Sequence, residues 1–135
     1  MKIRINLLRI ILLLAIVFLM LLGCRGIPKE IPDDLHPEEF FKLAQNAIVD
    51  WGNYRAALFY YEEFIERFPN MPGKIVEAEY EIAFIHYKRK NYEEAQARFN
   101  LILEKYQTQE SIHFQEWPKI LSEKILATIE TRQRG

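Results

Sequence analysis

Two segments of this chain match each other at a fixed shift of 38 residues. The first, WGNYRAALFYYEEFIERF, runs from Trp51 to Phe68, and the second, RKNYEEAQARFNLILEKY, runs from Arg89 to Tyr106. The matched pairs are Asn53 with Asn91, Tyr54 with Tyr92, Ala57 with Ala95, Tyr61 with Phe99, Phe64 with Ile102, and Phe68 with Tyr106. The apolar positions recur every three or four residues, which predicts helices. Such a duplication restricts the chain to stacked helical units, unless a plain four-helix bundle has acquired the periodicity by coincidence.

A second amphipathic segment precedes each copy, so the repeated unit is a pair of helices. These partners are PEEFFKLAQNAIVD, residues 37–50, and KIVEAEYEIAFIHYK, residues 74–88. After Tyr106 comes a polar stretch, QTQESIHFQE, and then a predicted fifth helix, PKILSEKILATIETR. Its predicted apolar stripe contains Ile120, Leu121, Leu126 and Ile129, with Ile125 beside it. We therefore predict an all-α domain over residues 37–135, with two helical hairpins and a C-terminal helix that caps the second.

The first 23 residues have the pattern of a secretory signal. A basic stretch with Lys2, Arg4 and Arg9 precedes an apolar run over residues 10–22. At about 1.5 Å per residue this run is roughly 20 Å long, which is shorter than the ~30 Å hydrocarbon core of a bilayer. A basic segment followed by a short apolar one is typical of a removed signal peptide. The alternative is a short N-terminal membrane anchor that is retained.

Cys24 is the only cysteine of the chain, and it directly follows the apolar run. A buried structural thiol does not suit this position, and a reactive thiol needs an activating partner nearby, which is lacking in the local sequence. The motif LLGC, residues 21–24, resembles the lipobox of bacterial lipoproteins. This resemblance implies a lipid on the Cys24 sulfur and cleavage between Gly23 and Cys24. Residues 24–36 contain Pro28 and Pro32 and are predicted to be an extended tether between the lipid anchor and the domain.

Charge and composition exclude several classes of function. Without residues 1–23 the chain has 15 basic and 19 acidic residues, a net charge of about −4, which argues against nucleic acid as a partner. The sequence has no glycine-rich phosphate loop and no metal-ligand spacing among His36, His86 and His113. Glu77 and Glu81 are interpreted as part of a solvated helix face. We therefore expect no enzyme activity, no cofactor and no metal.

The helical pairs resemble the tetratricopeptide repeat, in which small residues let paired helices approach and aromatic residues fill the space between units. The predicted packing residues are Phe41, Ala44, Ala57, Tyr61 and Phe64 in the first unit, and Ile82, Ala83, Ala95, Phe99 and Ile102 in the second. The usual period is about 34 residues. The four additional residues are assigned to FPNMPGK, the stretch between the two units.

The lipobox, the tether and the motifs FIERFP and NYEEAQARF together resemble the BamD/ComL family of outer-membrane assembly lipoproteins. The resemblance implies a lipid-anchored protein of the outer membrane that faces the periplasm. It also implies two kinds of protein partner, the barrel-forming assembly subunit and unfolded barrel precursors. This chain has fewer repeats than is usual in the family. An inner-membrane anchor, a scaffold for cell-wall or secretion machinery, and a periplasmic holdase remain as alternatives.

One stripe of the second unit is a candidate peptide-binding surface. Tyr80, Phe84 and Tyr87 recur at helical spacing, and Lys88 and Lys90 follow at the end of the same predicted helix. Aromatic rings followed by cations suit an extended peptide with apolar side chains and a terminal carboxylate. The alternative is that the tyrosines pack between helices and that the lysines compensate the helix dipole.

Overall fold

The computed structural model describes residues 26–28 and 31–134, and the part described contains helices and loops but no strand. The helices are α2 (Pro37–Trp51), α3 (Tyr54–Arg67), α4 (Pro72–Lys88), α5 (Tyr92–Lys105) and α6 (Trp117–Arg134), with a short 3-10 helix, η1 (Gln109–His113), before α6. The predicted all-α fold of two hairpins and a fifth helix is confirmed. The predicted signal segment and the predicted lipidation site at Cys24 lie outside the described residues.

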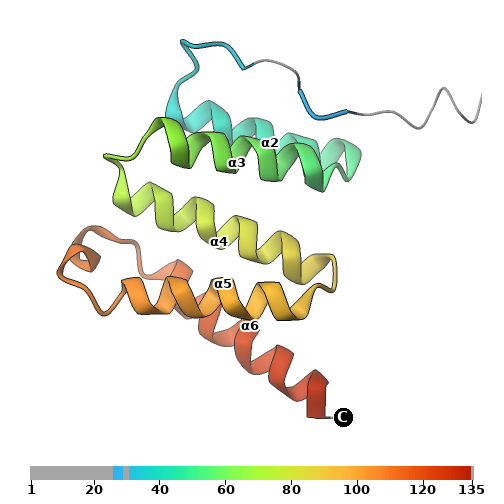
Figure 1. Cartoon of the computed structure of the whole chain (residues 1–135), viewed down its shortest axis with the longest axis vertical. Helices are drawn as coiled ribbons and strands as arrows, with labels where there is room; N and C mark the ends of the chain where they lie inside the picture. The colour runs from blue at the N-terminus through green and yellow to red at the C-terminus, as the bar shows by residue number, and fades with distance from the viewer. Residues whose placement is uncertain (1–25, 29–30, 135) are drawn as a thin grey trace, which may run out of the picture.

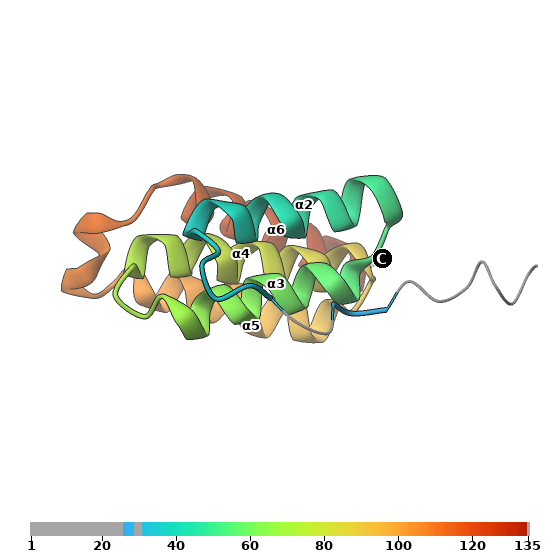
Figure 2. The same ribbon diagram turned by 90° about the horizontal axis from the view of Figure 1, so that it is seen from above.

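The helices stack in chain order in two layers. Figure 1 shows the α2–α3 hairpin above the α4–α5 hairpin, with α6 at the far end of the stack. Seen from above in Figure 2, α2, α4 and α6 lie toward one side and α3 and α5 toward the other. Both α2 and α4 pack against α3, while α4 and α6 pack against α5. The two layers therefore alternate along the chain, as the repeat predicts.

Both hairpins turn directly before the matched asparagine, although the backbone hydrogen bonds of the two turns differ by one residue. The residue before each asparagine has a left-handed backbone conformation, with φ of 58° at Gly52 and 64° at Lys90. After it, the Asn53 N–H donates to the Ala47 carbonyl at 2.8 Å, and the Asn91 N–H donates to that of His86 at 3.0 Å. The Asn53 side chain then accepts from the Ala56 N–H at 3.1 Å, which satisfies a free donor at the start of α3. Glycine adopts this conformation freely, whereas at Lys90 it costs about 1 kcal/mol.

Two adjoining groups of buried side chains hold the stack together. The first joins α2, α3 and α4 through Phe40, Phe64 and Ile82, and the second joins α4, α5 and α6 through Tyr80, Phe99 and Ile129. Nine of the ten predicted packing residues are buried: Ala44, Ala57, Tyr61, Phe64, Ile82, Ala83, Ala95, Phe99 and Ile102. The tenth, Phe41, is half-buried, and its ring centroid lies 5.4 Å from that of Tyr61 and 5.0 Å from that of Phe64.

The predicted apolar stripe of the last helix is wrong in part. Ile120 is 57% exposed and Leu121 is 37% exposed, while Pro118, Ser122 and Ile129 are the buried residues of α6. The buried face of α6 therefore includes Ser122 in place of Ile120 and Leu121. The Ser122 hydroxyl donates to the Pro118 carbonyl at 2.6 Å, so its burial leaves no polar group unpaired. Because serine is polar, the spacing of apolar residues does not predict that Ser122 is buried.

Three predicted segment limits also change. The helix expected from residue 74 begins at Pro72, and the polar stretch after Tyr106 includes η1. The predicted tether is not free over its whole length, because Ile31 and Leu35 pack against the first core group and Arg67 donates to the Pro32 carbonyl at 3.1 Å. Six residues, 25–30, lie between Cys24 and Ile31, so the two Cα atoms are at most about 23 Å apart.

Candidate protein-binding groove

A groove runs between α2 and α4, which both pack on α3 but have little direct contact with each other. Toward the C-terminal ends of α2 and α4 it deepens into a hollow of about 220 Å³. The residues that form its walls are mostly apolar, and the side chain of one of these residues, Val49, is 80% exposed. The residues that line the hollow are Gln45, Ile48 and Val49 of α2, Tyr54 of α3, and Glu81, Phe84, Ile85 and Lys88 of α4.

The groove continues toward the N-terminal ends of the same two helices. A second hollow of about 140 Å³ is lined by Pro37, Glu38, Phe41 and Lys74. The Lys74 ammonium lies 5.6 Å from the centre of the Phe41 ring and 2.8 Å from a carboxylate oxygen of Glu77. Both hollows are lined by α2 and α4, and each has at least one aromatic ring and a lysine in its lining.

The predicted aromatic stripe is divided between the groove and the core. Phe84 stacks between Tyr80 and Tyr87, with ring centroids 6.1 and 6.0 Å away, and it is the member that lines the hollow. Tyr80 is only 5% exposed and packs edge-on against Trp117 at 5.0 Å. Burial raises the pKa of Tyr80 to about 12. The prediction that Tyr80 contacts a peptide is wrong, because its ring is used to join α4 to α6.

Tyr87 belongs to a separate contact between the helix ends. Its ring centroid lies 5.8 Å from that of Tyr92, and the Arg132 guanidinium lies 5.7 Å from the Tyr87 ring centre. Arg132 also donates to the Tyr92 hydroxyl at 2.9 Å. These contacts fix the last turns of α6 against α4 and α5, so Tyr87 has a packing role, although its ring is half-buried.

The two predicted lysines also differ in position. Lys88 lines the hollow and is exposed, with its ammonium 5.9 Å from the centre of the Phe84 ring. Lys90 is the left-handed residue of the turn and does not line the hollow. Of the five predicted binding residues, the structure therefore brings Phe84 and Lys88 together in the groove.

Glu81 also lines this hollow, although the sequence pattern does not indicate it as a binding residue. It was assigned to a solvated face, but its side chain is half-buried, and within the described residues its carboxylate has no hydrogen bond or ion pair. Burial, with a smaller contribution from the negative charge of Glu77, raises the pKa of Glu81. Its charge in turn adds to the burial effect that raises the pKa of Tyr61 and Tyr80. The wall residues Ile48 and Val49 were likewise not predicted as binding residues, because neither carries a charge or ring.

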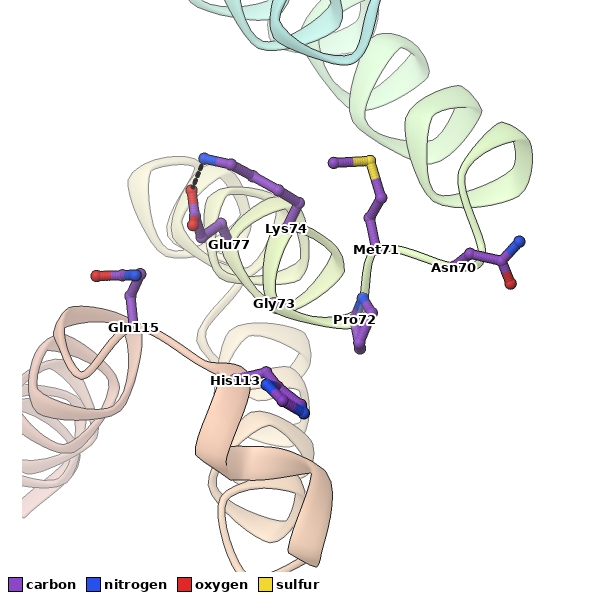
Figure 3. A pocket seen from close by; sticks show the side chains of 8 residues that line it. All are labelled: Asn70, Met71, Pro72, Gly73, Lys74, Glu77, His113 and Gln115. Carbon is purple, nitrogen blue, oxygen red and sulfur yellow. Dashed lines mark hydrogen bonds and ion pairs between the residues drawn. The ribbon is translucent and has the colours of Figure 1, made fainter.

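A larger depression lies elsewhere, between the N-terminus of α4 and the segment that leads into α6. It is an open space of about 550 Å³. Figure 3 shows the paired Lys74 and Glu77 at one side, with His113 and Asn70 well apart from them. Gly73 is required here, since a Cβ atom would lie 2.8 Å from the His113 carbonyl oxygen. The depression is thus formed by a close approach of two backbone segments, and its polar groups do not converge on a common point.

Other kinds of site are not found in the described part of the chain. Its histidine and carboxylate side chains form no group able to hold a metal ion. Among its helices, none combines the length and the apolar character needed to span a bilayer. The groove between α2 and α4 is therefore the feature of the described surface best suited to bind another molecule.

Comparison with known proteins agrees with the observed architecture. The tetratricopeptide repeat family matches residues 11–70 and 77–108. The chain is also 36% identical over 89 residues to an uncharacterized protein of Treponema pallidum (strain Nichols), over 64% of this chain and 35% of that protein. It thus spans about a third of the length of this relative. No solved structure matches.

Tetratricopeptide repeats mediate protein–protein interactions, and the match indicates no catalytic family. The matched segments include both hairpins apart from the first turn of α4. They cover more than half of the chain, and they agree with the paired helices, the repeated turn and the small residues buried between the helices. This chain belongs to the tetratricopeptide repeat family.

Proposed function

We propose that the chain is an adaptor that binds an extended segment of a partner protein in the groove between α2 and α4. The observation that carries this proposal is the hollow at Phe84, whose walls are mostly apolar and include the exposed Lys88 at one end. Binding sites of this kind are concave and mostly apolar, with a few polar groups that fix the orientation of the ligand. The apolar side chains of the segment fill the hollow, and an anionic group such as a terminal carboxylate meets Lys88.

The membrane anchor is the second part of the proposal. Its support is the LLGC motif at residues 21–24 and the basic and apolar segments that precede it. Two or three acyl chains on Cys24 hold a protein on a membrane much more firmly than one chain does. Because Ile31, Pro32 and Leu35 contact the folded part, the domain is expected to stay within about 25 Å of its lipid.

The third part is the process in which the adaptor acts, which we propose to be the assembly of β-barrel proteins in the outer membrane. The support is the resemblance to the BamD/ComL family in the lipobox, FIERFP and NYEEAQARF. In this proposal the partners are the barrel-forming assembly subunit and the apolar strands of unfolded barrel precursors. Both offer extended segments with alternating apolar side chains, which suit the groove.

Co-purification from envelope solubilised in mild detergent tests this function. Tagged full-length chain is expected to recover the barrel-forming subunit, identified by mass spectrometry, at a level well above that of untagged cells. Recovery of cell-wall or secretion enzymes in its place would support the scaffold alternative, and a changing mixture of unfolded proteins would support a holdase. Either result would contradict a role in barrel assembly.

A Cys24→Ser variant serves as the control for the anchor. It is expected to lose labelling by radioactive palmitate, while its helical circular dichroism stays unchanged. Palmitate labelling that persists in this variant would show that the lipobox interpretation is wrong.

A further inference from the structure

We propose that Glu81 selects partner segments that carry a lysine or arginine, by pairing with that cation inside the groove. This inference rests on the proposed function, because it names the chemistry of the segment that the groove binds. It begins from Glu81, which lines the apolar hollow beside Phe84 and Ile85.

The surroundings of Glu81 leave its charge uncompensated. Within the described residues its carboxylate forms no hydrogen bond or ion pair, whereas the neighbouring Glu77 is paired with Lys74 at 2.8 Å. Lys88 also lines the hollow, but it lies two helical turns from Glu81, and its ammonium is near the Phe84 ring. A half-buried carboxylate without a partner costs free energy, and a cation brought by a ligand removes this cost.

The groove thus presents three chemically different positions to a bound segment. Glu81 accepts a cation, Phe84 and Val49 offer apolar contact, and Lys88 attracts an anion. Glu81 and Lys88 are seven residues apart, about 10 Å along a helix. An extended chain covers that distance in about three residues at ~3.3 Å each. The preferred segment therefore has a basic residue three positions before its terminal carboxylate, with apolar residues between them.

Competing ligands are disfavoured by the same arrangement. A segment with an aspartate or glutamate at this position would bring a second negative charge beside Glu81, with Glu77 on the adjacent turn. A fully apolar segment would fill the hollow but leave the carboxylate buried and unpaired. Discrimination of this kind depends as much on the cost to the wrong ligand as on the gain for the right one.

Peptide binding to the full-length chain in detergent micelles tests the inference. The probes are three fluorescent decapeptides with a free terminal carboxylate and apolar side chains at the first and fifth residues before the terminus, on the same face of the extended chain as the third. They differ only at the third residue before the terminus, which is lysine, norleucine or glutamate. The lysine peptide is expected to bind about tenfold more tightly than the norleucine peptide and more tightly still than the glutamate peptide.

The matched variants are Glu81→Gln and Glu104→Gln, the second on the exposed surface of α5. Glu81→Gln is expected to remove the preference for lysine and to leave the norleucine peptide bound at least as tightly, whereas Glu104→Gln leaves the preference intact. Equal binding of the lysine and norleucine peptides by the unaltered chain would overturn the inference and leave the proposed groove standing. Failure of all three peptides to bind would overturn both. A lysine preference that survives Glu81→Gln would also overturn the inference, since the selectivity would then come from another residue.

Discussion

Replacement of Phe99 by alanine is expected to lower the free energy of unfolding by about 3–5 kcal/mol, the largest loss of any single truncation proposed for this chain. Phe99 is fully buried and lies between α4 and α6, with its ring centroid 5.7 Å from that of Tyr80. Truncation removes this apolar contact and leaves a cavity where three helices meet. For a domain of this size, 3 kcal/mol corresponds to a fall in melting temperature of roughly 12 °C or more. Thermal and urea unfolding followed by circular dichroism measure both quantities.

Leu101→Ala is the matched control for this prediction, because Leu101 is on the same helix but 57% exposed. Its truncation is expected to change stability by less than about 1 kcal/mol. If Phe99→Ala and Leu101→Ala had equal effects, the packing between the second hairpin and α6 described above would be wrong.

Replacement of Phe84 by alanine is expected to weaken the binding of the lysine peptide by about thirtyfold, equivalent to about 2 kcal/mol. Phe84 forms the aromatic wall of the hollow and orients the Lys88 ammonium over its face. Its loss removes apolar contact with the bound segment and the cation–π contact together. Fluorescence anisotropy at a temperature well below the unfolding transition measures the affinity without interference from reduced stability.

Phe59→Ala provides a control of the same chemistry. Phe59 is also a half-buried phenylalanine beside a tyrosine, with its ring centroid 6.0 Å from that of Tyr60, but it does not line the hollow. The Phe59→Ala variant is expected to be somewhat less stable than the unaltered chain and to bind the lysine peptide with the same affinity. An equal loss of affinity in both variants would mean that the effect of Phe84 acts through folding and not through contact.

The sequence predicted the fold well because the fold depends on local patterns that repeat. The match of Asn53 with Asn91 predicted where both hairpins turn, and the match of Tyr61 with Phe99 predicted the residues that fill each unit. The predictions were wrong at positions where a polar residue is buried or an apolar residue is exposed. Ser122 is buried because its hydroxyl bonds to its own helix, while Ile120 is left exposed. Composition alone does not reveal either fact.

The groove was predicted less well, because it depends on which face of each helix meets its neighbours. Tyr80, Phe84 and Tyr87 are equivalent in sequence spacing, but Trp117 covers Tyr80 and Arg132 covers Tyr87. Both covering residues come from α6, about forty residues further along the chain. For Glu81 the error was the opposite one. The sequence pattern predicted a solvated surface residue, but its carboxylate lies in an apolar hollow. Contacts between distant segments therefore determined which predicted residues remain free to bind.

Site-specific photo-cross-linking at Val49 tests the central claim most directly. Val49 and Ile112 are both 80% exposed, but Val49 lines the groove and Ile112 is on η1, away from it. A photoreactive phenylalanine is placed at each position in turn in cells that make the full-length chain, and the adducts are identified by mass spectrometry. We expect adducts with barrel precursors or the barrel-forming subunit from Val49 and few or none from Ile112. Adducts of equal yield at both positions, or from Ile112 alone, would contradict the assignment of the groove between α2 and α4 as the binding site.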